Sequence, residues 1–228
     1  MALIVKTMVC LANSRKLSGR CVAGKELNED SPGGWIRPVS DRPHQEVSEY
    51  ERHYQDGQDP RVLDIINIPL KRHQPATYQS ENWLLDPDHY WARAGSISWN
   101  DLFELSDTPS LLWINGFSTS NGSNDRIPIA DADALDSSLL LLHLDELTLR
   151  VFAPGLDFGN PKRRVQAEFS YSGEFYGLWV TDPIIERAYL AGENGHYSLG
   201  ECFVTVSLGE PHEGYCYKLV ATIMTRGA

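Results

Sequence analysis

Small polar and basic side chains occur together near the start of this sequence, directly after an apolar stretch. The members of this first basic cluster are Asn13, Ser14, Arg15, Lys16 and Arg20. Side chains of these types that leave the end of a strand together with free backbone N–H groups would suit an anion such as phosphate. Arg37 could join them if the next strands pair alongside. The alternative is a solvated turn, because the segment matches no P-loop or dinucleotide-binding fingerprint.

A second basic cluster and several aromatic residues lie in the C-terminal half. Lys162, Arg163 and Arg164 are consecutive, and Tyr215 and Tyr217 stand near the end of the sequence. Cations that follow phosphates, and rings that stack on bases for roughly 1–3 kcal/mol per base, are what binding of a single strand requires. The alternative is that the cations are solvated and the rings belong to the core.

Carboxylate and imidazole side chains are present but form no recognised catalytic motif. The candidate acids and bases are Asp41, His44, Asp125, Asp182, Glu210 and His212. No H-E-x-x-H or G-x-S-x-G sequence gives them defined roles. The four cysteines lie far apart without a C-x-x-C pair, so we expect unpaired thiols and neither a zinc site nor another cofactor. The sequence therefore assigns no catalytic residue.

The composition limits the possible partners. The chain has 228 residues, of which 42% are hydrophobic, enough for one large domain or two small ones. Its net charge of -11 opposes non-specific attraction to DNA or RNA, so a nucleic-acid site must be a local basic patch. The apolar runs are too short to span a bilayer, and no secretory cleavage pattern follows the first apolar segment. We expect a cytoplasmic protein without a membrane partner.

Alternating apolar and polar residues predict strands in the C-terminal half, and Ser172-Gly173 predicts a tight turn between two of them. Asp182-Pro183 predicts a helix start, because aspartate accepts from free backbone N–H groups and proline fits the first helical turn. The expected strands are residues 138–152, 163–171, 174–181, 200–208 and 215–224, with a helix at 183–190. This is the order of an oligonucleotide/oligosaccharide-binding (OB) barrel, although an unrelated α+β sheet can share it.

The N-terminal half predicts a similar series of elements. Its expected strands are residues 3–11, 21–23, 35–39 and 62–70, with a polar helix or loop at 44–54 and a capped helix at 98–105. Asn, Gly, Ser and Asp are frequent from residue 115 to residue 138, which indicates a connection. The predicted fold is mainly β, with two tandem OB-like barrels and short helices. The expected parts are an N-terminal domain at 1–120, a connecting segment at 121–137 and a C-terminal domain at 138–228.

Several segments resemble the bacterial dual OB domain-containing proteins. The segments are CLANSRK at 10–16, GRCVAG at 19–24, GWIRPVS at 34–40, NDRIP at 124–128, NPKRRV at 160–165, LWVTDP at 178–183, SLGEP at 207–211 and YCYKL at 215–219. The resemblance covers nearly the whole chain. It implies two OB barrels in tandem and brings no catalytic residue with it.

These observations favour a non-enzymatic protein that binds single-stranded DNA, single-stranded RNA or a nucleotide. In an OB barrel the ligand usually lies over the second and third strands, between the loops that join strands one and two and strands four and five. Two alternatives remain open. One is an enzyme or enzyme subunit that acts on nucleotides or modified nucleic acid, and the other is a protein-interaction module whose acidic surface meets a basic partner.

Overall fold

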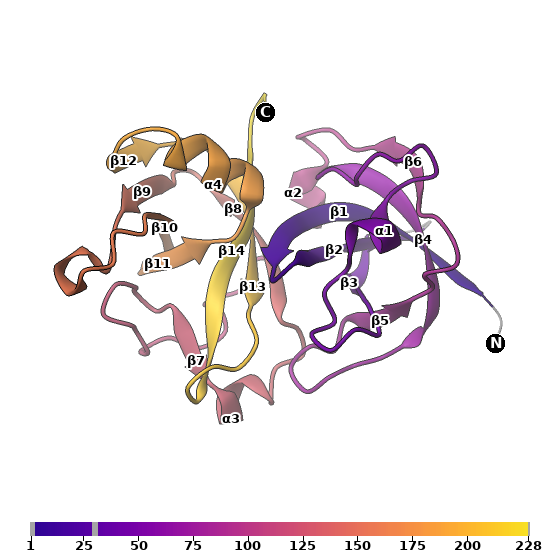
Figure 1. Ribbon diagram of the computed structural model, residues 1–228, viewed down its shortest axis with the longest axis horizontal. Helices are drawn as coiled ribbons and strands as arrows, with labels where there is room; N and C mark the ends of the chain where they lie inside the picture. The colour runs from indigo at the N-terminus through magenta and orange to yellow at the C-terminus, as the bar shows by residue number, and fades with distance from the viewer. Residues whose placement is uncertain (1–2, 29–31, 228) are drawn as a thin grey trace. The chain divides into compact units, whose positions relative to one another are not determined.

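The computed structural model describes residues 3–28 and 32–227 and shows a mainly β protein with a few short helices, as the sequence predicts (Figure 1). The chain forms two compact units. Unit 1 comprises Met1–Leu105 and Asp136–Ser138, and unit 2 comprises Ser106–Leu135 and Leu139–Ala228.

Unit 1 is a barrel whose first strand pairs on both sides. Its strands are β1 (Ile4–Lys16), β2 (Gly19–Leu27), β3 (Pro32–Val39), β4 (Asp64–His73), β5 (Asn82–Leu85) and β6 (Ala92–Ser96), with helices α1 (Glu49–Arg52) and α2 (Leu102–Leu105). The sheet order is β1-β2-β3-β5-β4, and a further β1–β4 pairing closes it. A bulge between Cys10 and Ala12 interrupts the β1–β2 register. A bulge bends a strand, so β1 can pair with β2 along one edge and with β4 along the other. The resulting closed order β1-β2-β3-β5-β4 is the strand order of an OB barrel.

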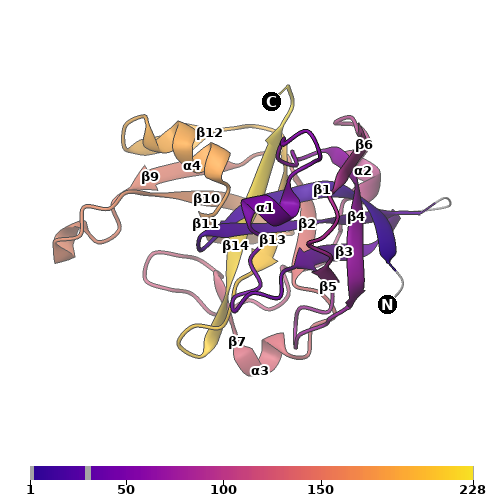
Figure 2. The same cartoon turned by 45° about the vertical axis from the view of Figure 1, so that its right-hand side comes forward.

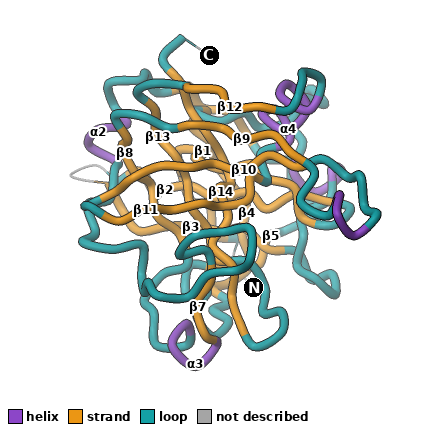
Figure 3. The backbone as a smooth tube through the Cα atoms, turned by 90° about the vertical axis from the view of Figure 1, so that its left-hand side faces the viewer, coloured by secondary structure: helices purple, strands orange, loops and turns teal. Residues whose placement is uncertain are grey.

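Unit 2 has the same strand order, but two shorter strands form its first barrel strand. Its elements are β7 (Arg126–Pro128), α3 (Ile129–Ala132), β8 (Leu139–Leu144), β9 (Thr148–Phe152), the 3-10 turn η1 (Leu156–Phe158), β10 (Arg164–Tyr171), β11 (Glu174–Val180), α4 (Pro183–Leu190), β12 (Gly195–Ser198), β13 (Cys202–Leu208) and β14 (Tyr215–Thr225). The strand order is β9-β10-β11-β14-β13-β8. Strands β8 and β9 together take the place of one long first strand, so the short connection between them closes the barrel. Figure 3 shows β9, β10 and β11 side by side.

The predicted helix at 183–190 is confirmed as α4, between the third and fourth barrel strands. The Asp182 carboxylate accepts hydrogen bonds from the backbone N–H groups of Ile184 and Ile185, at 2.9 and 3.3 Å. The expected strand at 138–152 is instead divided, because residues 145–147 leave the sheet between β8 and β9. The sequence did not reveal this division, because apolar residues continue on both sides of residues 145–147.

The segment from residue 106 to residue 135 belongs to unit 2, which differs from the expected division at 121–137. Leu112 is fully buried in the core of the second barrel. Ser123 forms a bridge with Gly177 of β11, and β7 pairs with the start of β14. The β11–β14 pairing itself is short, covering Trp179 and Val180. The segment therefore completes the barrel where its third and fifth strands separate.

Lys218 on β14 is the side chain that attaches this segment to the barrel. It is fully buried, and its Nζ donates to the carbonyl of Ile114 at 2.7 Å and to Oδ1 of Asn115 at 3.0 Å. The Tyr176 hydroxyl accepts from Asn115 Nδ2 at 2.9 Å, and the Lys218 backbone N–H donates to the carbonyl of Asp125 at 2.8 Å. Burial lowers the pKa of Lys218 from 10.5 to about 7, and the charge of Asp125 partly opposes this change.

We predict that Lys218 makes the free energy of unfolding of unit 2 rise with pH. Its pKa is lower in the folded protein than in the unfolded chain, so above about pH 7 the unfolded state binds a proton that the folded state does not. Relative to Lys218→Met, the wild-type free energy should increase by roughly 1.4 kcal/mol per pH unit between about pH 7.5 and 8.5. Urea unfolding with pulse-labelling hydrogen exchange on unit 2 measures this. If the difference in unfolding free energy between the wild type and Lys218→Met stayed constant with pH, the lowered pKa of Lys218 would be contradicted.

Candidate functional site

The outer face of β9, β10 and β11 carries aromatic and cationic side chains. Along each strand these residues alternate with residues that face the core. Leu149 and Val151 point into the barrel core, so Arg150 and Phe152 point outward, because successive residues of a strand face opposite sides. The register pairs Phe152 with Arg164, and pairs Gln166 with Trp179. These residues therefore share one face, which in an OB barrel is the face that usually meets ligands.

Four of these side chains form a layered stack. The rings of Phe152 and Trp179 are stacked, with centroids 5.7 Å apart and an interplanar angle of 23°. The Arg150 guanidinium carbon lies 4.0 Å from the centroid of the Phe152 ring, and that of Arg164 lies 3.9 Å from the Trp179 ring. We call Arg150, Phe152, Trp179 and Arg164 the cation–aromatic stack. Stacking on rings holds each guanidinium in a defined plane, and a guanidinium plane can itself stack on a base while its N–H groups meet phosphate.

Strand β12 extends this face by one strand beyond the five of the barrel. It pairs antiparallel with β9 and places His196 opposite Arg150. The carboxylate of Glu168 lies between them, with Oε1 3.6 Å from Arg150 Nη1 and Oε2 3.7 Å from His196 Nε2. An acidic group thus lies beside the cation–aromatic stack.

The segment before β7 borders the same face. Gln166 is buried and lies between Arg150 and Trp179 in the strand register, and its Nε2 donates to the carbonyl of Asn121 at 2.5 Å. Asn124 Nδ2 donates to the carbonyl of Phe175 at 3.1 Å, and Ser123 and Gly177 exchange backbone hydrogen bonds. The position of this loop therefore sets one edge of the face.

The second basic cluster divides among three environments. Arg164 belongs to the stack, whereas the Arg163 guanidinium donates to the carbonyls of Leu190 and Gly192 and to Asn194 Oδ1, at 2.7–3.1 Å. Arg163 therefore stabilises the C-terminal end of α4. Lys162 is exposed on the long β9–β10 loop, which extends away from the strands of unit 2 (Figure 2).

The two tyrosines that the sequence offered for stacking on bases, Tyr215 and Tyr217, lie at the start of β14. The Arg126 guanidinium lies 4.1 Å from the centroid of the Tyr215 ring, and the Tyr217 ring lies 6.2 Å from that of His212. Both tyrosines are half-buried. They form a second aromatic and cationic group, next to the β13–β14 loop.

The first basic cluster lies within the β1–β2 hairpin and not beyond a strand end, which corrects the expectation of free backbone donors. β1 continues to Lys16 and pairs with β2, so that Arg15 lies opposite Arg20. Asn13 Nδ2 donates to the carbonyl of Pro60 at 2.8 Å, and Ser14 is buried, with Oγ 3.5 Å from the carbonyl of Cys21. Arg15 is exposed, and Lys16 and Arg20 are half-buried near the turn.

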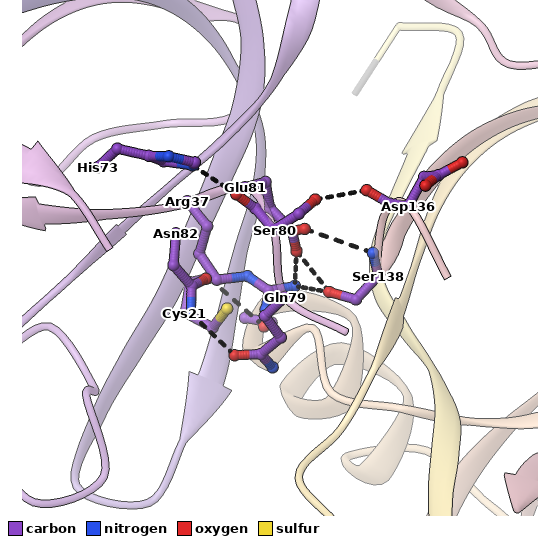
Figure 4. Close-up of polar contacts among 10 residues, drawn as sticks. Cys21, Arg37, His73, Gln79, Ser80, Glu81, Asn82, Asp136 and Ser138 are labelled. Atoms are coloured by element: carbon purple, nitrogen blue, oxygen red, sulfur yellow. Dashed lines mark hydrogen bonds and ion pairs between the residues drawn. The ribbon is translucent and has the colours of Figure 1, made fainter. Parts of the chain in front are cut away.

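Arg37 does not join that cluster in an open pocket, because its charge is compensated inside unit 1 (Figure 4). The side chain is buried, with Nη2 3.0 Å from Glu81 Oε1 and 2.9 Å from Ser138 Oγ. Ser138 Oγ in turn donates to Glu81, and Ser80 Oγ donates to the carbonyl of Asp136. Arg37 therefore anchors the short return of the chain to unit 1 at 136–138.

The candidate acids and bases have local structural partners or lie in exposed loops. Asp125 is buried and accepts from the backbone N–H and hydroxyl of Thr119, and Asp182 caps α4. The residues in exposed loops are Asp41, His44, Glu210 and His212. Among the described residues, no group of three His, Cys, Asp or Glu side chains is placed to hold a metal ion.

The four cysteines are free thiols in the structure, and Cys10, Cys202 and Cys216 are buried. Burial raises the pKa of Cys10 and of Cys202 to about 12. Both thiols are thus held in the protonated, weakly reactive form at neutral pH. Within the described part of the chain, no helix is long and apolar enough to cross a membrane.

The sequence patterns did not identify Arg150, Phe152 or Trp179 as candidate ligand residues. Arg150 and Phe152 alternate with the apolar Leu149 and Val151, so the period of two already placed them on one face. The missing information was the register across the long β9–β10 loop, which brings Arg164 next to Phe152.

We predict that Arg37→Met destabilises unit 1 by about 3–5 kcal/mol, because it leaves Glu81 as a buried, uncompensated charge. The double variant Arg37→Met/Glu81→Leu should recover most of this loss, since replacing both partners of a buried ion pair is close to neutral. Urea unfolding of the wild type, both single variants and the double variant measures the coupling. Equal and additive losses would show that the pair does not act as a unit.

The comparisons with known proteins agree with this geometry. The family model for the dual OB-containing domain matches residues 6–223, which extends through both barrels. The searches of curated proteins and of solved structures found no match. Because the family model covers more than half of the chain, this protein belongs to the family of the dual OB-containing domain.

Proposed function

We propose that this protein is a non-enzymatic binding protein, active in the cytoplasm, that holds single-stranded nucleic acid or a nucleotide on the outer face of β9, β10 and β11. The observation that carries the proposal is the cation–aromatic stack of Arg150, Phe152, Trp179 and Arg164. It lies over the strands with which OB barrels usually bind such ligands. The guanidinium groups at the two ends of the stack can supply stacking and phosphate contacts, which single strands of any sequence can use.

The acidic balance of the chain is compatible with this function. A net charge of -11 disfavours non-specific binding, so affinity for a polyanion must come from cations held at fixed positions. The ring of Trp179 fixes Arg164, and the ring of Phe152 fixes Arg150. Such fixed guanidinium groups lose less conformational freedom on binding than flexible lysines do.

We also propose that cations outside the stack contribute further phosphate contacts. Lys162 lies on the β9–β10 loop, which joins the first and second barrel strands of unit 2. In unit 1, Arg15, Lys16 and Arg20 lie around the β1–β2 turn, the corresponding loop of the first barrel.

A second candidate function is contact with a basic protein partner, and the aromatic surface of unit 1 favours it. Tyr50 and Tyr90 are 74% and 56% exposed, and the ring of His53 lies 5.7 and 5.2 Å from theirs. Exposed Glu49 and Asp88 stand close to these rings in the sequence. Aromatic rings beside carboxylates suit the arginine and lysine side chains of another protein.

We predict that Arg150→Ala/Arg164→Ala weakens binding of single-stranded DNA and RNA of about ten nucleotides by at least roughly tenfold. Removing two phosphate contacts should also reduce the slope of log affinity against log salt by about 1.4, because fewer counterions are released. Fluorescence anisotropy across a salt series measures both quantities. The matched control is Arg72→Ala/Arg187→Ala, which removes the same charge from exposed positions outside the stack.

The two double variants separate the candidate functions. Equal affinity and equal salt slope in the folded stack variant and the control would contradict nucleic-acid binding on this face. In that case the basic-partner function predicts that Tyr50→Ala/Tyr90→Ala, and not the stack variant, loses binding to an oligoarginine peptide. Arg15→Ala/Lys16→Ala tests the hairpin contribution in the same assay, with a smaller reduction of slope expected.

A further inference from the structure

Glu168 requires an explanation if the outer face of β9, β10 and β11 binds nucleic acid. A carboxylate beside the cation–aromatic stack repels a phosphate backbone. The Glu168 side chain is 21% exposed, so it remains accessible from solvent. It is held on β10 in the same row as Thr148 of β9 and Gly177 of β11.

The partners of Glu168 leave its oxygens available for stronger hydrogen bonds. Oε1 is 3.6 Å from Arg150 and Oε2 is 3.7 Å from His196, both longer than the 2.7–2.9 Å typical of charge-assisted hydrogen bonds. The two oxygens face different cations, one on β9 and one on β12. Arg150 and His196 can orient the carboxylate and stabilise its charge, but neither of them forms a bidentate ion pair with it.

The side of Glu168 toward β11 is filled, whereas Arg150 on its β9 side is accessible from solvent. Gly177 lies opposite Glu168 without a side chain, but the Ser123 backbone and the Gln166 side chain stand 3.3–3.7 Å from the place that a Cβ would take there. The Arg150 side chain is 39% exposed, and its Nη1 lies 3.6 Å from Glu168 Oε1. A base that stacks on the exposed side of the Arg150 guanidinium would therefore have its edge beside Glu168.

We propose that Glu168 reads the edge of a bound base and prefers guanine, an inference that rests on the proposed function of the stack. Guanine presents two adjacent donors on its Watson–Crick edge, N1–H and the N2 amino group, which match the two oxygens of one carboxylate. Adenine and cytosine present an amino group beside an acceptor, and uracil presents one N–H between two acceptors. An ionised carboxylate accepts only, so it is repelled by those acceptors.

Arg150 and His196 act in this proposal as positioning residues. Arg150 belongs both to the stack and to the Glu168 pair, so the stacking layer and the base-reading carboxylate are mechanically connected. His196 is 62% exposed on β12, the strand added to the barrel. This strand thus gives the face a specificity element that the five barrel strands do not supply.

The experiment compares a uridine hexamer with the same hexamer carrying one central guanosine, by fluorescence anisotropy on the full chain. The wild type should bind the guanosine hexamer about tenfold more tightly. Glu168→Gln should reduce this preference to less than about threefold and bind the uridine hexamer at least as tightly as the wild type, because one repulsive charge is gone. Glu174→Gln changes an exposed residue at the start of β11, is the control for the charge change and should keep the preference.

A ligand-side measurement makes the test independent of the variant's folding. Inosine in place of guanosine lacks the N2 amino group, so its hexamer should bind the wild type more weakly than the guanosine hexamer. Wild-type binding without a guanosine preference, or a preference that Glu168→Gln retains, would overturn base reading and leave the proposed function intact. Failure of the wild type to bind any of the hexamers would overturn the proposed function together with the inference.

Discussion

The buried amino group of Lys218, with its two oxygen acceptors, is the interaction on which the architecture of unit 2 depends. Removing an amine from water is costly unless oxygens replace its hydration, and the carbonyl of Ile114 and the side chain of Asn115 provide them. Both acceptors belong to the segment that precedes β7, outside the five barrel strands. The segment and the lysine therefore stabilise each other: without the segment the amine would be buried without partners, and without the amine the segment would lose its attachment.

This attachment also positions the loop that borders the outer face of β9, β10 and β11. Once residues 112–115 are fixed, the chain that follows brings the Asn121 carbonyl to Gln166 and the Ser123 backbone to Gly177. Gln166 is buried in the same row as Arg150 and Trp179, so its hydrogen bond connects the loop with that row of the face. The same polar loop that looked like a connection in the sequence thus forms one border of the site and completes the barrel between β11 and β14.

The two barrels share a strand order and differ in the chemistry of the equivalent strands. In unit 1, Val9, Ala12 and Ala23 on β1 and β2 are buried and lie outside the core cluster of that barrel. In unit 2, β9 presents Arg150 and Phe152 at the equivalent place. Fold alone does not determine which barrel binds a ligand. The distribution of cations and rings favours unit 2 for the binding that we propose, and Glu168 would add the proposed selectivity.

The sequence by itself determined the mainly β class of the protein, the helix α4 and its place along the chain between the strands at 174–181 and 200–208, because alternation and helix capping depend on residues close together in the chain. It also identified Arg164 as a candidate ligand residue. Only the tertiary structure decided that Arg37 pairs with Glu81, that Arg163 stabilises the end of α4, and that Phe152 and Trp179 stack. Each of these contacts joins residues far apart in the sequence, and their partners follow from strand register and chain crossing, which local composition does not encode.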